Sequence, residues 1–483
     1  MAQNNMLLIL FVSAIITSFL YLWVQITHMN STCAQISSNY ITKSVWNHSW
    51  SNQIFDNLYG WRLIGADMKE QARLHKISSI VAAWSENVVD NIPIVPSLSA
   101  DRHLLVLSAS ASRVRYGMSV TFIMVFPTDV NRVLPKTNLG QPLSPTQLKL
   151  WCIFNDGSVT SAYSYDLNYF NDRVSLVDCP LSSFASDELW RHNRTLRVYL
   201  VSTTDMDRNI PILKAFVTVP QSALVQWHSS QQLLTLCTSP LHNKAHQLAQ
   251  WIEFHRLVGF QKFVVYNSTD TNGYLSSVLS SYAQKYPNLV DVVQWNFSAL
   301  ALTDPITTRY FQLESLHDCL IRYGDQSEWL GALDLDEYIV PLPPYKTVLD
   351  YVNENFGQRA IGSINLWSQF YCTQSTATYT GIENDTSLLA IERFTVRAPT
   401  RFKSGREKYL YRPRFVQYLS IHHQVVGLPK QEPSKNHIML AHYGFMNNLR
   451  ALPGCDRVKL VKDTSIRDRF ANRVHDAVRR LLT

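Results

Sequence analysis

The feature that most constrains the fold is a change of hydrophobic period near residue 232. After that point, short apolar runs alternate with segments of helical spacing. The strand-like runs are 233–237, 262–266, 289–295 and 329–333, and the helix-like segments between them are 245–258, 273–286 and 308–323. Strands and helices that alternate at this size predict a mostly parallel sheet with helices on both faces. We therefore expect an α/β domain over residues 226–483.

The last of these strands leads directly into Asp334-Leu335-Asp336, after which the apolar pattern resumes at Tyr338. In open α/β sheets, ligands bind at the carboxyl ends of the strands. Mg²⁺ and Mn²⁺ favour carboxylates together with substrate phosphates, so two aspartates here predict a site for a divalent ion and a diphosphate. A solvated turn is the alternative. A second such motif, Asp205-Met206-Asp207, lies among antiparallel-type strands and is the weaker candidate.

The region before this domain has a different pattern. From residue 101 to 225, short β-rich runs are separated by turn formers such as Pro127-Thr128-Asp129 and Asn155-Asp156-Gly157. Repeated short strands of this kind predict a small β-sandwich. Many sandwiches bind carbohydrate, although that inference rests on fold analogy alone.

The N-terminus carries an apolar run over residues 6–26 that contains no Asp, Glu, Lys, Arg or His, and it is long enough to span a bilayer as a helix. A cleaved signal peptide is the alternative, but residues 1–5 contain no Lys or Arg and the run is long for one. We expect a short cytoplasmic tail at 1–5, a signal-anchor at 6–26 and a stem at 27–100. One transmembrane helix would place the rest of the chain in the secretory lumen.

Cysteines and glycosylation motifs agree with that compartment. None of the seven cysteines forms a Cys-x-x-Cys pair, which argues against zinc. Six can form three disulfides, of which Cys152–Cys179 is the best-supported pair, and Cys33 can link two chains into a homodimer. The candidate N-glycosylation sites are Asn47, Asn193, Asn296 and Asn384. A formal net charge of +7 is modest for 483 residues, and no nucleic-acid motif is present.

Glycosyl transfer from a nucleoside diphosphate must neutralise a leaving diphosphate. Asp334 is the candidate contact for ribose and metal, Asp336 for the metal, and His442 is a possible third metal ligand because neutral imidazole suits Mn²⁺. Lys408 and Arg412 are the candidate diphosphate contacts. The alternative for His442 is a histidine that only packs against its neighbours. The alternative for Lys408 and Arg412 is an exposed strand face.

Two further donor contacts and a base complete the predicted site. We assign Tyr266 and His423 to the donor; His422 and His423 point to opposite faces of a strand, so at most one of them faces the cleft. An inverting transferase also needs a carboxylate base. Spacing does not choose among the candidates Glu383, Asp385, Glu392 and Glu407, and Glu392 is preferred only because residues 390–397 are predicted to form an ordered strand.

Several motifs, taken together, resemble glycosyltransferase family 92 between residues 233 and 444. They are Gln250-Trp251-Ile252-Glu253-Phe254-His255, Lys262-Phe263 with Tyr266, Asp318-Cys319-Leu320-Ile321-Arg322, residues 329–341, Thr400-Arg401-Phe402, Lys408 with Arg412-Pro413, Ile421-His422-His423 and His442-Tyr443.

This resemblance implies a GT-A fold in a type II Golgi membrane protein. It also implies inverting, Mn²⁺-dependent transfer of galactose from UDP-galactose, with β1,4 linkage to an N-glycan galactose or fucose. Asp334 and Asp336 match the family's metal motif, and His442 matches a metal or phosphate contact. Gly444 departs from the basic or polar residue expected after His442-Tyr443. The alternatives are a transferase for another UDP-sugar and a catalytically inactive, membrane-anchored glycan-binding protein.

Overall fold

The computed structural model describes the chain in separate ranges. They are residues 97–98, 105–112, 119–125, 150–154, 158–169, 172–190, 196–202, 213–217, 234–242, 245–269, 273–295, 311–357, 359–372, 388–402, 405–431, 436–443, 455 and 459–483. The predicted signal-anchor, the stem and all four candidate glycosylation sites lie outside these ranges. Among the helices inside them, none has the length and apolarity needed to cross a bilayer.

The central sheet has the predicted parallel core. Its strands are β10 (Leu234–Thr238), β11 (Leu241–His242), β12 (Lys262–Thr269), β13 (Val290–Gln294), β14 (Trp329–Leu333), β16 (Ser363–Leu366), β19 (Lys408–Tyr411) and β22 (Lys430–Gln431). The order is β11-β12-β10-β14-β19-β16-β22, and β13 also pairs with β12. β12, β10 and β14 run parallel, whereas β19 is antiparallel to both of its neighbours, so the sheet is mixed.

A second sheet begins directly after the Asp-x-Asp turn. It consists of β15 (Glu337–Pro341), β23 (Ile438–Tyr443), β17 (Ser368–Cys372), β18 (Val396–Arg397) and β24 (Val461–Lys462), in that order. β15 and β23 are antiparallel, and their register places Glu337 opposite His442. The turn therefore joins the carboxyl end of β14 to a strand of another sheet.

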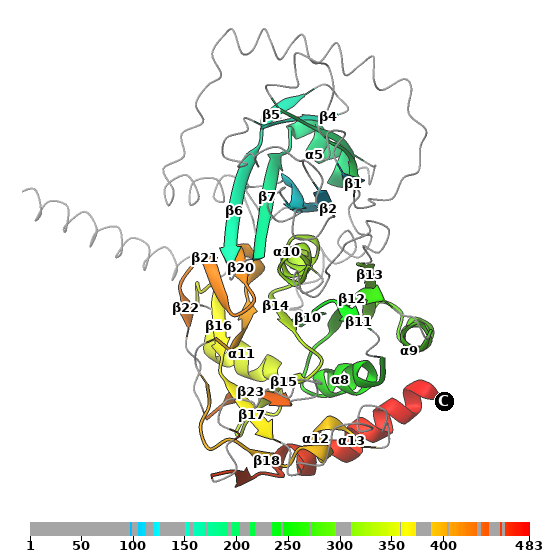
Figure 1. The fold of residues 1–483 in the computed structure, drawn as a ribbon, viewed down its shortest axis with the longest axis vertical. Helices are drawn as coiled ribbons and strands as arrows, with labels where there is room; N and C mark the ends of the chain where they lie inside the picture. The colour runs from blue at the N-terminus through cyan, green and yellow to red at the C-terminus, as the bar shows by residue number, and fades with distance from the viewer. Residues whose placement is uncertain are drawn as a thin grey trace, which may run out of the picture. The chain divides into compact units, whose positions relative to one another are not determined.

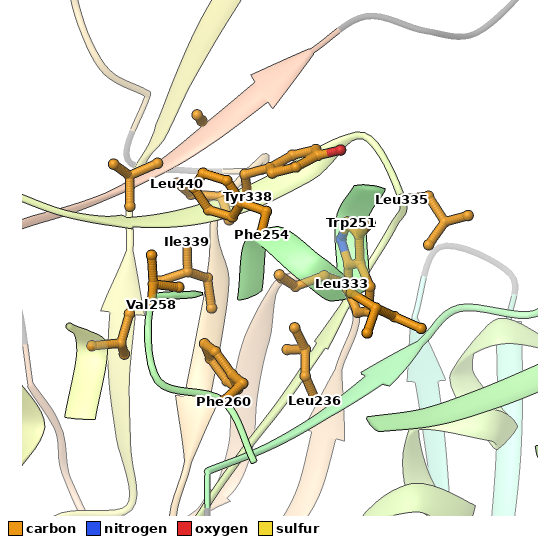
Figure 2. Close-up of a cluster of buried hydrophobic side chains, with 14 of the residues drawn as sticks. Leu236, Trp251, Phe254, Val258, Phe260, Leu333, Leu335, Tyr338, Ile339 and Leu440 are labelled. Carbon is orange, nitrogen blue, oxygen red and sulfur yellow. The ribbon is translucent and has the colours of Figure 1, made fainter. Parts of the chain in front are cut away.

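Helices and one large apolar core hold the two sheets together. The helices of this region are α8 (Ala245–Leu257), α9 (Tyr274–Lys285), α10 (Gln312–Tyr323), α11 (Val348–Phe356), α12 (Ala390–Arg393) and α13 (Ser465–Leu482). α13 packs against α8, α9 and α12 (Figure 1). Figure 2 shows Trp251 and Phe254 of α8 beside Leu333 of β14 and Tyr338 of β15. The residues on both sides of the turn are thus anchored in buried apolar packing.

The predicted strand at residues 390–397 is wrong for its first half. Ala390–Arg393 form the short helix α12, and only Val396–Arg397 are extended. The cause is local, because the Glu392 carboxylate accepts the backbone N–H of Leu389 at 2.9 Å and so caps the first turn.

The region before the central sheet is β-rich and antiparallel, as predicted. One sheet has the order β1 (Ser97–Leu98), β2 (Leu105–Ser112), β3 (Ser119–Val125), β7 (Asp172–Pro180), β6 (Tyr163–Tyr169), and the other has β5 (Val159–Ser161), β4 (Leu150–Phe154), β8 (Leu196–Ser202), β9 (Leu213–Val217). The predicted Cys152–Cys179 disulfide is present and joins β4 of one sheet to β7 of the other. Two further disulfides, Cys237–Cys319 and Cys372–Cys455, complete the three pairs allowed by the sequence.

Candidate active site

The Asp334-Leu335-Asp336 turn is closed by hydrogen bonds from both of its ends. The Glu337 N–H donates to the Asp334 carbonyl at 3.0 Å, and the Asp334 N–H donates to Oε2 of Glu337 at 3.0 Å. The Tyr443 N–H also donates to the Asp336 carbonyl at 2.8 Å. Leu335 is buried in the apolar core, whereas the Asp334 side chain is 41% exposed. This geometry fixes the backbone and leaves the Asp334 carboxylate accessible.

Lys408 brings a buried positive charge to this turn. It opens β19, and its Nζ lies 3.2 Å from Oδ2 of Asp334 and 3.2 Å from Oε2 of Glu337. Burial disfavours the ammonium ion, but the Asp334 and Glu337 charges outweigh burial and raise the pKa of Lys408. Two residues predicted separately for the site, Asp334 and Lys408, are therefore in contact, and the lysine is charged at neutral pH.

His442 of β23 lies on the other side of the turn. Its Nε2 is 3.7 Å from Oδ2 of Asp336, and its Nδ1 is 3.5 Å from Oε1 of Glu337. The ring contacts Phe370, with the two centroids 4.9 Å apart. Burial opposes protonation, but the Asp336 carboxylate, followed by Glu337 and Asp334, raises the pKa of His442. The predicted residues Asp336 and His442 are thus neighbours.

Glu337 is the central residue of this cluster, and the sequence prediction did not include it. Its side chain is fully buried, and its backbone carbonyl accepts the indole N–H of Trp251 at 2.9 Å. Burial raises the pKa of Glu337 to about 7; Lys408 opposes this shift, while Asp334 adds to it. The available signal was a third acidic residue directly after the Asp-x-Asp motif, at the first position of an otherwise apolar strand.

Gln312 is a second residue that sequence reasoning missed. It begins α10, and its Nε2 donates to Oγ of Ser239 at 2.7 Å and to Oδ1 of Asp334 at 3.3 Å. The Ser239 N–H donates to the Leu333 carbonyl at 3.0 Å. Gln312 therefore links the carboxyl ends of β10 and β14, where ligands of α/β sheets bind.

Of the two adjacent histidines, His422 is the one whose side chain the structure places near the cluster. Its Nδ1 lies 3.0 Å from the Glu407 carbonyl, and burial together with the Lys408 charge lowers the pKa of His422 to about 4. His422 is therefore neutral at pH 7, and its Nδ1 donates to that carbonyl. His423 begins β21 (His423–Gly427), and its side chain lies outside the described residues.

The structure does not bring three other predicted site residues to this cluster. Tyr266 is buried and donates its hydroxyl to Asp318 at 2.7 Å. The Glu392 carboxylate pairs with Nε2 of His475 at 2.8 Å, in addition to capping α12.

Arg412 is the third. It follows the last residue of β19, and its guanidinium donates to the carbonyls of Phe356 and Gly357 at the end of α11, each at 3.1 Å. It also pairs with Glu328 at 3.0 Å. Its donors face these partners and not Asp334.

The side chains of this cluster match the ligands that a protein contributes to a divalent-metal site. Over the ranges that the structure describes, no three His, Cys, Asp or Glu side chains form a ready-made metal-binding group. Mg²⁺ and Mn²⁺ need only one or two carboxylates when substrate phosphates supply the other ligands. Nδ1 of His442 is buried without a hydrogen bond of normal geometry, and Nε2 faces Asp336. Asp336 and His442, with Asp334 adjacent, therefore fit an ion that a bound diphosphate completes.

Comparison with known proteins points in the same direction. The sequence model of glycosyltransferase family 92 matches residues 232–481. A glycosyltransferase family 92 protein from Oryza sativa subsp. japonica is 25% identical over 144 residues, which are 29% of this chain and 21% of the relative. A beta-1,4-galactosyltransferase from Caenorhabditis elegans is 24% identical over 195 residues, 39% of this chain and 42% of the relative. The aligned stretches thus span less than half of either relative.

Proposed function

The chain belongs to glycosyltransferase family 92, and from this premise we propose that it transfers galactose from UDP-galactose to a hydroxyl group of a glycan, with inversion. The observation that carries the proposal is the convergence of Asp334, Asp336, Lys408 and His442 at the carboxyl end of β14. The choice of galactose and of a β1,4 linkage is supported by the similarity to a protein named beta-1,4-galactosyltransferase.

The residues of the site suit the departure of UDP. The bond from the anomeric carbon to the diphosphate breaks as the acceptor oxygen attacks, so negative charge builds up on the diphosphate. The Lys408 ammonium is held in place before the reaction by Asp334 and Glu337, so it stabilises this charge with little reorganisation. A Mn²⁺ ion held by Asp336 and His442 would supply Lewis-acid stabilisation of the same leaving group.

Gln312 and the turn itself keep Asp334 in place. The hydrogen bond from Gln312 fixes one carboxylate oxygen, and the Lys408 ion pair fixes the other. Such positioning matters because small displacements of binding groups cost rate. The acceptor base is left unassigned, since Glu383 and Asp385 lie outside the described residues and Glu392 is engaged by His475.

A Golgi membrane location with a luminal catalytic domain belongs to the same proposal. It is supported by the apolar run at 6–26 and by three disulfides, which persist in oxidising compartments. Microscopy of the tagged full chain, together with protease protection of the tag in sealed vesicles, tests it. A lumenal N-terminus or a cytosolic location would contradict it.

The reaction is tested with the full chain, purified in mild detergent and incubated with Mn²⁺, a panel of UDP-sugars and an array of glycans. Mass spectrometry then reads the products of the wild type, of Asp336→Ala and of the surface control Asp476→Ala. We expect a hexose to be added from UDP-galactose by the wild type and the control, but not by Asp336→Ala. Transfer from a different UDP-sugar would overturn the donor assignment. A folded wild type that neither transfers a sugar nor binds UDP would indicate a glycan-binding protein without activity.

A further inference from the structure

Three groups, one from the turn after β14 and one each from β19 and β23, converge on one buried carboxylate. Oε2 of Glu337 accepts the Asp334 N–H at 3.0 Å and lies 3.2 Å from Nζ of Lys408. Oε1 of Glu337 lies 3.5 Å from Nδ1 of His442. The Glu337 side chain is only 1% exposed, so its carboxylate contacts these protein groups and not the solvent.

The backbone fixes the position of Glu337 independently of its side chain. Glu337 opens β15 and lies directly opposite His442 in the antiparallel register. Side chains directly opposite each other in an antiparallel pair share one face of the sheet and have Cβ atoms about 5 Å apart. The Trp251 indole N–H also holds the Glu337 carbonyl. The contact between the Glu337 carboxylate and the His442 ring is therefore imposed by the fold.

This contact determines which nitrogen of His442 can bind a ligand. Both ring nitrogens face a carboxylate, because Glu337 lies beside Nδ1 and Asp336 beside Nε2. With Asp336 bound to an ion, only Glu337 would be left to hold the ring proton, on Nδ1, and the lone pair would lie on Nε2. Nε2 is the nitrogen that faces Asp336, at 3.7 Å. Histidines that bind metals commonly donate their other N–H to a carboxylate, which fixes both the tautomer and the ring orientation. The same carboxylate also holds the Lys408 ammonium beside Asp334.

We propose that Glu337 is a positioning residue of the donor site, which orients His442 with its Nε2 toward Asp336 and holds Lys408 beside Asp334. The inference rests on the proposed function. Glu337 does not touch the donor in this account; it acts through the imidazole, the ammonium and the backbone of the turn. The competing explanation is that Glu337 only balances the buried charge of Lys408.

The test compares Glu337→Gln with Glu253→Gln in the full chain. Glu253 is a matched control because its carboxylate is also buried, pairs with Arg256 at 2.8 Å and accepts the Tyr282 hydroxyl, but it lies on α8 away from the cluster. Calorimetry measures UDP binding as Mn²⁺ is titrated. Substitution of a group that orients a metal ligand typically weakens metal affinity about 10- to 100-fold. We expect that shift in half-saturating Mn²⁺ for Glu337→Gln and less than about a twofold shift for Glu253→Gln.

The outcomes distinguish a failure of the proposed function from a failure of the role of Glu337. If the wild type shows no Mn²⁺-dependent UDP binding, the proposed function fails. If the wild type binds and Glu337→Gln requires the same Mn²⁺ concentration, only the positioning role of Glu337 fails.

A second measurement covers a Glu337→Gln variant that does not fold. Nitrogen NMR of the wild type with UDP and the diamagnetic ion Mg²⁺ at mildly alkaline pH, with the His442 signals identified by their loss in His442→Asn, reports the tautomer of the neutral ring when Asp336 can bind an ion. A proton on Nδ1 supports the role of Glu337. A proton on Nε2 would overturn it, because that nitrogen could not then present its lone pair toward Asp336.

Discussion

The carboxylates of Asp318 and Asp334 show how different surroundings give the same chemical group different roles. Asp318 of α10 is completely buried and accepts hydrogen bonds from the Tyr266 hydroxyl at 2.7 Å, from Arg322 at 2.8 and 3.1 Å and from the Ser108 hydroxyl. Asp334 is 41% exposed and shares the Lys408 ammonium with Glu337. The carboxylate of Asp318 is saturated by protein donors, whereas that of Asp334 faces the surface with a cation beside it.

Both charged motifs belong to the set that resembles the family, but only the one at Asp334 is suited to a ligand. Removing one partner from a largely buried ion pair costs stability because the other charge stays partly buried and unpaired. Asp318 joins β12, α10 and β2 through Tyr266, Arg322 and Ser108, so its task is to hold these elements together. Asp334 lies where ligands of an α/β sheet bind, and in the proposed function its carboxylate contacts the donor.

Lys408→Met should give the largest loss of activity. The substitution removes the preorganised charge that stabilises the leaving diphosphate, and loss of one such group typically costs about 100- to 1,000-fold in kcat. Initial rates of galactose transfer at saturating donor measure the effect.

Lys262→Met is the matched control for this prediction. Lys262 is also a buried lysine of the central sheet, but it pairs with Asp291 and the Asn288 carbonyl. Equal activities of the two variants at a temperature where both are folded would contradict the assignment of Lys408 to the donor site.

Asp318→Asn should act on stability. Loss of one partner of a buried ion pair costs about 3 kcal/mol in the free energy of unfolding, and the value here should not exceed this, because the remaining partner, Arg322, is 27% exposed. Urea unfolding followed by tryptophan fluorescence measures it, and kcat/KM at low temperature should remain within about threefold of the wild type. A variant that keeps its stability but loses transfer would contradict the structural role of Asp318.

The fold was more accessible from sequence than the site. The predicted helix at 308–323 is α10 (Gln312–Tyr323), and the predicted strands end within a few residues of β10, β12 and β14, because long periodic runs specify such elements. The Cys152–Cys179 pair was predicted from the β-rich pattern around both residues.

The parts of the site that were missed depend on register between distant strands. Glu337 meets His442 only because β15 and β23 pair as they do, and a single sequence does not contain that register. Lys408 and Arg412 are both candidate diphosphate contacts in the sequence, but β19 ends at Tyr411 and the Arg412 guanidinium donates to the carbonyls at the end of α11.

The pH dependence of the free energy of unfolding tests whether His255, a buried histidine with both ring nitrogens hydrogen-bonded, stabilises the fold in its neutral form. The Nδ1 of His255 pairs with the Trp251 carbonyl, Nε2 accepts the Ile339 N–H, and burial lowers the pKa of His255 to about 3. The pKa of this histidine is about 6.5 in the unfolded chain. Below that pH the unfolded chain binds a proton that the folded chain does not bind, so the free energy of unfolding decreases as the pH is lowered. By pH 5 the loss from this residue is about 2 kcal/mol.

Unfolding free energies of the wild type and of His255→Gln between pH 7 and 5 measure this contribution. The variant is expected to be less stable at pH 7 and to lose less stability on acidification. If His255→Gln keeps the full pH slope of the wild type, the assignment of that slope to a buried neutral histidine is refuted.

Glu392→Gln should have the smallest effect. Glu392 and His475 are both partly exposed, and such surface pairs contribute about 0–1 kcal/mol. Transfer rates should stay within about twofold of the wild type, since neither residue lies in the Asp334 cluster. A large loss of kcat in this variant, with its thermal stability retained, would return Glu392 to the position of catalytic base.

The most direct test of the central claim is whether UDP binding requires both a divalent ion and Asp336. Calorimetric titration of UDP into the full chain, with Mn²⁺ or with EDTA, compares the wild type with Asp336→Ala. We expect binding heat for the wild type with Mn²⁺ and none with EDTA, and no binding by a folded Asp336→Ala protein in either buffer. Equal binding of UDP by the wild type and the variant would contradict the placement of the donor site at the carboxyl end of β14.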